Sequence, residues 1–234
     1  LLDDAASAGQ GNDSIFFEGS QANQTINAGN GNDTLTLQSA TVFGGRASFG
    51  EGDDRFILSA GQLNGGLVQG NQGEDVITFL GGAINSTVGA GQGDDSIAIT
   101  AGNLQFSQAF GAKGKDTITL NCLAASNHAG FSLQGSQGSD LLLVTGAQTF
   151  SASFIGMGKG GDSILFNNVA ATDTTTIAGG GLNDTINVRL GLNSGMVVYG
   201  DANGTTTVGT ATGGGADGDD SIFATAGYVS AGSI

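Results

Sequence analysis

Apolar residues recur in a fixed pattern along the chain, with a period of roughly 21 residues. In each repeat an aspartate is followed, two and four positions later, by large apolar residues. Because alternate side chains of a strand face the same side, this spacing predicts a short strand after each aspartate. The two columns are Ile15, Leu35, Phe56, Ile77, Ile97, Ile118, Leu142, Ile164 and Ile186, and Phe17, Leu37, Leu58, Phe79, Ile99, Leu120, Val144, Phe166 and Val188.

A third apolar column lies seven residues before each aspartate and predicts a second strand in every repeat. Its members are Ala6, Ile26, Ala47, Val68, Val88, Ala109, Leu133, Ile155 and Ile177. Two short strands and two turns account for the period, and a fixed period of this size is typical of a solenoid. We therefore predict an all-β parallel β-roll or β-helix of about ten coils, in which two parallel sheets face each other across a thin core.

The regularity changes towards the C-terminus. The spacing widens around residues 121–130, and 36 residues separate Asp184 from the next motif aspartate, Asp220, a step too long for one coil and too short for two. Residues 200–219, within this step, are rich in Gly and Thr. We interpret residues 1–199 as regular coils, 200–219 as an outward loop, and 220–234 as the start of a further, truncated coil. The first coil also starts in mid-repeat, so we expect the solenoid to continue into adjoining repeats or to stack end to end on other copies.

Charge narrows the classes of partner. The chain has 6 Lys and Arg against 21 Asp and Glu, giving a formal charge of −15, which argues against nucleic acid and anionic membranes and favours cations. No apolar run is long enough to predict a membrane span. Cys122 is the single cysteine, so no intrachain disulfide can form. Cys122 and His128 are a weak zinc signal, and we interpret them as ordinary loop or strand-end residues.

The turn before each aspartate has the form Gly-x-Gly-x-Asp, as in Gly9-Gln10-Gly11-Asn12-Asp13. This turn resembles the calcium-binding nonapeptide of RTX proteins. The resemblance implies a right-handed β-roll with several Ca²⁺ ions between consecutive coils, held by turn carboxylates and carbonyls. The implied ligands are Asp13, Asp33, Asp54, Asp75, Asp95, Asp116, Asp140, Asp162 and Asp184, with carbonyl donors near Gly9, Gly11, Gly29, Gly31, Gly50, Gly52, Gly73, Gly91 and Gly93.

In RTX proteins the turn recurs on both sides of the roll, whereas here one side keeps it. The residues nine positions before each aspartate, from the second repeat on, are Gln24, Gly45, Gly66, Ser86, Ser107, Phe131, Ser153 and Thr175. We therefore expect a single row of calcium sites, on one side of the solenoid.

Physical chemistry supports the same ion. Stacked coils would bring successive aspartates about 4.8 Å apart, where unpaired carboxylates repel one another. Calcium takes six to eight oxygen ligands and would neutralise the column, so we expect folding to require calcium. Two alternatives stay open: aspartate is a common turn residue, and Lys113, Lys115 and Lys159 could neutralise the column instead. Some turns also lack a motif glycine, which is replaced by Asn71, Ala112, Ser136 or Leu182.

These observations predict a calcium-stabilised structural or adhesive rod of a secreted, extracellular protein, such as a surface layer, an adhesin or a filament, and not an enzyme. A β-helical enzyme module acting on polysaccharides and an ice-binding roll are the alternatives. An enzyme would need convergent catalytic groups, and ice binding a repeated flat array. Cell-surface polysaccharide is a further candidate partner, but the residues that could contact it, Arg46, Arg55, Arg189, Tyr199 and Tyr228, fall at unrelated offsets.

Overall fold

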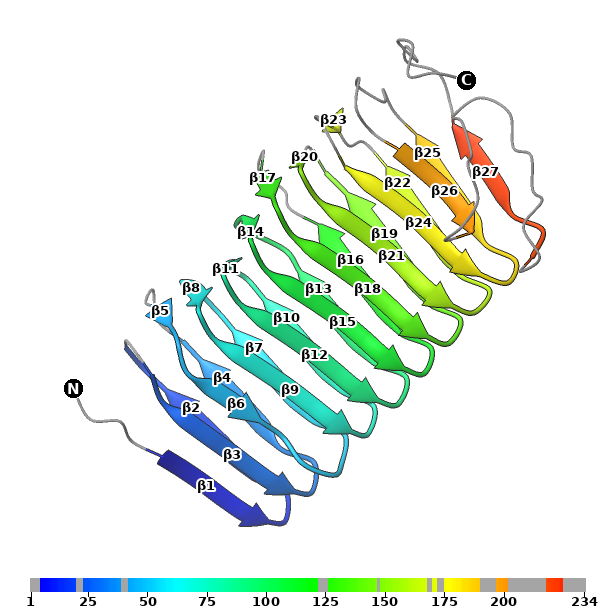
Figure 1. Ribbon diagram of the computed structural model, residues 1–234. Coiled ribbons are helices and arrows are strands. Elements are labelled where there is room, and N and C mark those ends of the chain that lie inside the picture. The colour runs from blue at the N-terminus through cyan, green and yellow to red at the C-terminus, as the bar shows by residue number, and fades with distance from the viewer. Residues whose placement is uncertain are drawn as a thin grey trace.

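The computed structural model is a parallel β-solenoid whose coils stack along one axis (Figure 1). It describes residues 5–19, 23–38, 42–121, 126–146, 148–167, 170–171, 175–189, 197–201 and 218–224. All strand pairs within the described ranges are parallel, each strand bonding to its counterpart in the next coil. The predicted all-β solenoid is confirmed.

Two ten-stranded sheets run the length of the solenoid, as the apolar columns predicted. The first sheet contains β1 (Ala5–Gln10), β3 (Thr25–Asn30), β6 (Arg46–Ser48), β9 (Leu67–Gln72), β12 (Thr87–Gln92), β15 (Gln108–Lys113), β18 (Ser132–Gln137), β21 (Phe154–Lys159), β24 (Thr176–Gly181) and β26 (Val197–Asp201). The second contains β2 (Ser14–Phe17), β4 (Thr34–Leu37), β7 (Arg55–Leu58), β10 (Val76–Phe79), β13 (Ser96–Ile99), β16 (Thr117–Asn121), β19 (Leu141–Thr145), β22 (Ser163–Asn167), β25 (Thr185–Arg189) and β27 (Ser221–Ala224).

A third sheet corrects the expectation of two strands per coil. It has seven very short strands: β5 (Val42–Phe43), β8 (Gln62–Asn64), β11 (Gly82–Ile84), β14 (Leu104–Gln105), β17 (Ser126–Ala129), β20 (Gln148–Ser151) and β23 (Ala170–Ala171). Strands of two to four residues are too short to show a period-2 pattern, so the sequence indicated only a turn there. Six of these strands carry a buried side chain that packs in the core: Phe43, Leu63, Ala83, Leu104, His128 and Phe150.

All three sheets contribute to one continuous core. The inward columns stack residue upon residue: Ile77 lies beside Phe56 in one neighbouring coil and beside Ile97 in the other. Aromatic rings also stack between coils, with the ring centroids of Phe56 and Phe79 5.5 Å apart. Each coil therefore covers the apolar face of the next, which is the usual source of stability in solenoids.

The C-terminal coil is described in part. β26 pairs with β24, and β27 pairs with β25. Residues 202–217, which connect β26 to β27 in the chain, are outside the described residues. Gly200 and Asp201 belong to β26, within the range that the sequence assigned to a loop. Residues 225–234 are also outside the described ranges.

The turn between the two long sheets requires unusual backbone geometry. The second motif glycine has a positive φ in successive coils, for example +134° at Gly93 and +131° at Gly114. A side-chain carbon added at Gly114 would lie 1.9 Å from the carbonyl oxygen of Gly93 in the preceding coil. Ala112, which replaces the first motif glycine, has a φ of +92°. The stacked turns thus favour glycine at both positions.

This geometry predicts opposite effects for two substitutions in one turn. Ala112→Gly should raise the free energy of unfolding by about 1 kcal/mol, because it relieves a positive φ. Gly114→Ala should lower it by roughly 2 kcal/mol or more, because the added carbon meets fixed backbone. Urea denaturation measures both. Ala98→Gly, on strand β13, is the control and should be destabilising; a stabilising effect there would mean that the gain at Ala112 does not come from its φ.

Candidate functional site

The motif aspartates form one column along the corner between the two long sheets. Each lies between the glycine turn and the first residue of a strand of the second sheet. Their side chains are almost completely buried, with exposed fractions of 1–3% from Asp33 to Asp184, and Asp13 in the first coil is partly buried. The structure therefore brings together all the aspartates that the sequence predicted, but it places them inside the corner.

A ladder of hydrogen bonds links these aspartates from coil to coil. The Oδ1 atom of each one accepts a hydrogen bond from the backbone N–H of the motif aspartate in the preceding coil. The N–H of Asp54 thus donates to Asp75 Oδ1 at 2.8 Å, and the N–H of Asp75 donates to Asp95 Oδ1 at 2.7 Å. The series runs from Asp13 to Asp220. One oxygen of each carboxyl group from Asp33 onwards is therefore used to fix the register of the coils.

A second ladder runs in the opposite direction on the outside of the turn. It is formed by the exposed residue that precedes the motif aspartate. Asn12 Oδ1 accepts from the N–H of Asn32 at 2.8 Å, and Asp53 Oδ1 accepts from the N–H of Glu74 at 2.9 Å. Asp94 Oδ1 accepts from the N–H of Lys115 at 2.8 Å. Adjacent turns are thus joined on both sides.

The second carboxyl oxygen of the inner column lacks a hydrogen-bond partner in most coils. The Oδ2 atom is buried and unpaired in Asp13, Asp33, Asp54, Asp75, Asp95, Asp116, Asp140 and Asp162. Leaving a buried carboxylate oxygen without a donor or a cation is costly. A proton or a metal ion is therefore needed to complete this column.

Oxygen atoms of the next coil face these unpaired atoms. A side-chain carbon added at Gly70 would lie 2.1 Å from Asp75 Oδ2 and 2.3 Å from the carbonyl oxygen of Ala90. A carbon at Gly135 would lie 2.2 Å from Asp140 Oδ2 and 2.7 Å from the carbonyl oxygen of Met157. The carboxyl oxygen and a carbonyl oxygen thus border the same small space, which exists in these coils because the residue five positions before the aspartate is Gly.

Burial changes the acidity of the column. Desolvation raises the pKa of Asp54 and Asp95 to about 7, and that of Asp75, Asp116 and Asp162 to about 6, from an ordinary value of 3.8. The ladder hydrogen bond offsets part of this rise in each of them, while neighbouring aspartates add to it. Burial likewise raises the pKa of Asp140. Asp54 and Asp95 are therefore about half protonated near pH 7, and Asp75, Asp116 and Asp162 near pH 6.

The donor chemistry fits calcium, because carboxyl and backbone carbonyl oxygens border the same spaces. Within the described ranges no three His, Cys, Asp or Glu side chains converge on one point, because each coil supplies one buried carboxylate. Calcium prefers carboxylate and carbonyl oxygens, and both kinds border the spaces beside the unpaired Oδ2 atoms. An ion there would be held by the motif aspartates together with strand carbonyls such as those of Ala90 on β12 and Met157 on β21.

Two coils differ at the position that borders this space. Phe49 lies five residues before Asp54, and Met157 lies five residues before Asp162; both side chains are buried. The turn of Asp54 has both motif glycines, so the motif alone did not reveal this difference. The side chains of Lys113, Lys115 and Lys159 are exposed, whereas the carboxyls of the motif aspartates are buried. These lysines therefore lie on the outer surface of the turns.

The column that lacks aspartate lies at a different corner, between the third and first sheets. There Ser86, Ser107 and Ser153 are buried, and each hydroxyl donates to the carbonyl oxygen two residues earlier, at 2.7–2.9 Å. Ser107 Oγ also accepts from the N–H of Ser86 at 3.3 Å. Neutral hydroxyls in these coils thus occupy positions that the RTX-like pattern would fill with carboxylates.

His128 is a core residue of the third sheet. Its Nδ1 atom accepts a hydrogen bond from the N–H of Leu104 at 3.1 Å, and its ring stacks on Phe150 with centroids 5.2 Å apart. Cys122 lies outside the described residues. The arrangement of His128 is that of a satisfied buried side chain within strand β17.

Comparison of the chain with protein-family models, with curated proteins and with solved structures finds no significant match. No described segment forms a helix long and apolar enough to cross a membrane.

The raised pKa values predict that acid stabilises the metal-free protein. Because the folded-state pKa lies above 3.8, protonation favours the folded state; this contribution is complete below about pH 4 and is lost as the pH rises through about 6 to 7. In the presence of a chelator the melting temperature should be several degrees higher at pH 5 than at pH 8. Circular dichroism measures it, and a higher value at pH 8 would contradict the prediction.

Substituting one inner aspartate should separate its two roles. Asp95→Asn keeps an Oδ1 acceptor for the N–H of Asp75 but removes the buried charge. At pH 8 in the presence of a chelator, the variant should melt a few degrees above the wild type. Calcium should raise the melting temperature of the variant less than that of the wild type. Asp94→Asn, in the exposed ladder of the same turn, is the control and should keep the full calcium-induced gain. Equal responses of the two variants would show that burial does not distinguish the two columns.

Proposed function

We propose that this chain is a calcium-stabilised structural rod of a secreted, extracellular assembly. The observation that carries the proposal is the buried aspartate column with unpaired oxygens, which runs along a solenoid with a continuous core. A column of this kind couples folding of the rod to a cation supplied by the surroundings.

The residues of the chain account for a rigid body. Each coil is joined to the next by two long sheets and by the aspartate ladder at the turn. The third sheet adds to this in the middle coils, and the outer ladder in several coils. Ten strands at about 4.8 Å spacing give a rod of roughly 45 Å along the described coils. The motif aspartates hold the register through Oδ1 and present Oδ2 to the space between coils. Bound calcium would neutralise these carboxyls and so allow the column to stay buried at neutral pH.

The expected weakness of the calcium sites favours an extracellular setting. Sites completed mainly by backbone carbonyls, with one carboxylate per coil, are weakly charged, and weak calcium sites suit surroundings with abundant calcium. An adhesin shaft, a surface layer and a filament all need a stiff spacer, and the proposal includes each of them.

Within the described residues, no feature specifically favours the enzyme or the ice-binding alternative. Arg46 on β6 donates to Gln69 Oε1 at 2.7 Å, while Arg55 lies on β7 of the other long sheet. The outward row of the first sheet includes Arg46, Leu67, Gln108 and Phe154, so it lacks the repeated surface that ice binding would require.

Calcium titration tests the proposal. Metal-free protein at pH 8 should gain stability with a midpoint at about 10⁻⁴–10⁻³ M calcium, the range of extracellular modules. Melting temperature across the titration gives the midpoint, and small-angle X-ray scattering should show a rod at saturation. Magnesium at the same concentrations is the control and should stabilise less. No response to calcium would contradict a calcium role, and a midpoint near 10⁻⁷ M would contradict the extracellular setting.

A further inference from the structure

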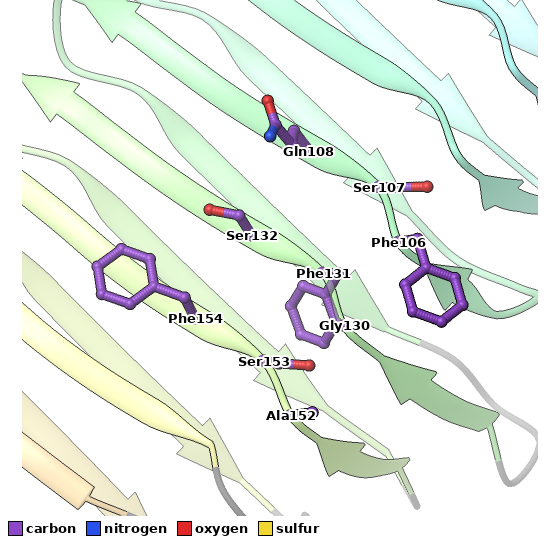
Figure 2. A pocket seen from close by; sticks show the side chains of 9 residues that line it. All are labelled: Phe106, Ser107, Gln108, Gly130, Phe131, Ser132, Ala152, Ser153 and Phe154. Atoms are coloured by element: carbon purple, nitrogen blue, oxygen red, sulfur yellow. The ribbon is translucent and has the colours of Figure 1, made fainter.

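A groove of about 450 Å³ opens on the surface where the third sheet meets the first. It crosses three successive coils and is lined by Phe106, Ser107, Gln108, Gly130, Phe131, Ser132, Ala152, Ser153 and Phe154 (Figure 2). Phe106 and Phe154 are 48 positions apart in the chain, so no sequence pattern links the two rings.

The backbone at the corner builds the groove. Phe106, Gly130 and Ala152 occupy the same corner position in successive coils, with φ values of +48°, +60° and +47°. The Phe106 side chain is 68% exposed at this position. Gly130 and Ala152 have little or no side chain there, so the surface beyond the Phe106 ring is hollow.

Two phenyl rings with exposed faces border the hollow. A side-chain carbon added at Gly130 would lie 2.8 Å from Cδ1 of Phe106, and one added at Gly156 would lie 2.7 Å from Cε1 of Phe154. Each ring therefore rests on a glycine backbone, and Phe154 is still 43% exposed. Figure 2 shows the two rings on opposite sides of Phe131. Rings held in this way offer fixed apolar platforms to a ligand.

Polar groups lie between the platforms. Gln108, Ser132 and Phe154 are in register on three neighbouring strands, so the ring and the Gln108 amide are roughly 10 Å apart, two strand spacings. Gln108 is exposed, and Ser132 Oγ accepts from Gln134 Nε2 at 3.0 Å, which leaves the Ser132 hydroxyl proton available. No Asp, Glu, Lys or Arg is among the lining residues.

We propose that this groove binds a neutral oligosaccharide. A sugar ring has an apolar C–H face that can lie on a phenyl ring, and hydroxyl groups at its edge that can bond an amide and a hydroxyl. An anionic polymer would be repelled by a chain of charge −15. A cationic peptide would find no carboxylate in the lining, and a purely apolar partner would leave the Gln108 amide unpaired. The proposal is independent of calcium and of the rod function, although a surface rod that binds glycans would act as an adhesin.

Isothermal titration calorimetry of the intact chain, in calcium at pH 7.5, tests this proposal with cellohexaose, maltohexaose and chitohexaose. At least one should bind, and Phe106→Ala and Phe154→Ala should each weaken its binding by about tenfold or more. Phe16→Ala is the matched control, since Phe16 is 52% exposed on strand β2, outside the groove, and it should leave the affinity unchanged. Circular dichroism shows whether each variant is folded.

Gln108→Ala provides a second readout should a ring variant fail to fold, because this side chain is exposed. It should weaken binding severalfold. The proposal is overturned if none of the three sugars binds, or if binding is unchanged in the groove variants. It is also overturned if polygalacturonate binds more tightly than every neutral sugar, or if Phe106→Ala abolishes self-association seen by sedimentation, which would make a second copy the occupant. Loss of calcium-dependent melting with sugar binding intact would refute the proposed rod chemistry alone.

Discussion

Burial of one carboxyl group per coil is the interaction on which the rest of this structure depends. The inner aspartate can reach the N–H of the preceding coil only from inside the corner, and there its second oxygen is cut off from water. Desolvation of that oxygen is unfavourable for the ionised form, and the raised pKa of Asp54 and Asp95 expresses the same cost. The stability of the solenoid is thereby linked to whatever neutralises the column, whether a proton or a metal ion.

The same corner explains the glycines of the motif turns. To bring Asp75 Oδ1 within reach of the Asp54 N–H, successive turns must stack backbone on backbone, as the close approach of Gly114 to Gly93 shows. A side chain has no room there, and the positive φ suits glycine. The carboxyl ladder and the glycine turns are therefore two consequences of one tight stacking of coils.

The inside and the outside of the solenoid serve different purposes. Inside, positions are constrained by the coils on both sides, so most of them stay apolar from repeat to repeat. Outside, a residue such as Phe106 is supported from one side only, so its exposed face can vary without affecting the core. Stability thus comes from the repeated interior, and any recognition must come from outward positions that depart from the repeat, as Phe106 and Phe154 do.

The sequence by itself determined the period, the two long sheets and the aspartate column, because each is written as residues at a constant offset. The tertiary structure alone decided three other features. Strands such as β14 are too short to show a pattern, and pair only because the longer sheets hold them in register. The inward direction of the carboxyls depends on the N–H groups of the neighbouring coil, and the Phe49 side chain beside Asp54 belongs to no motif. Phe106 and Phe154 border one groove because stacking places residues that are 48 positions apart in the chain only two coils apart, a proximity that sequence separation does not contain.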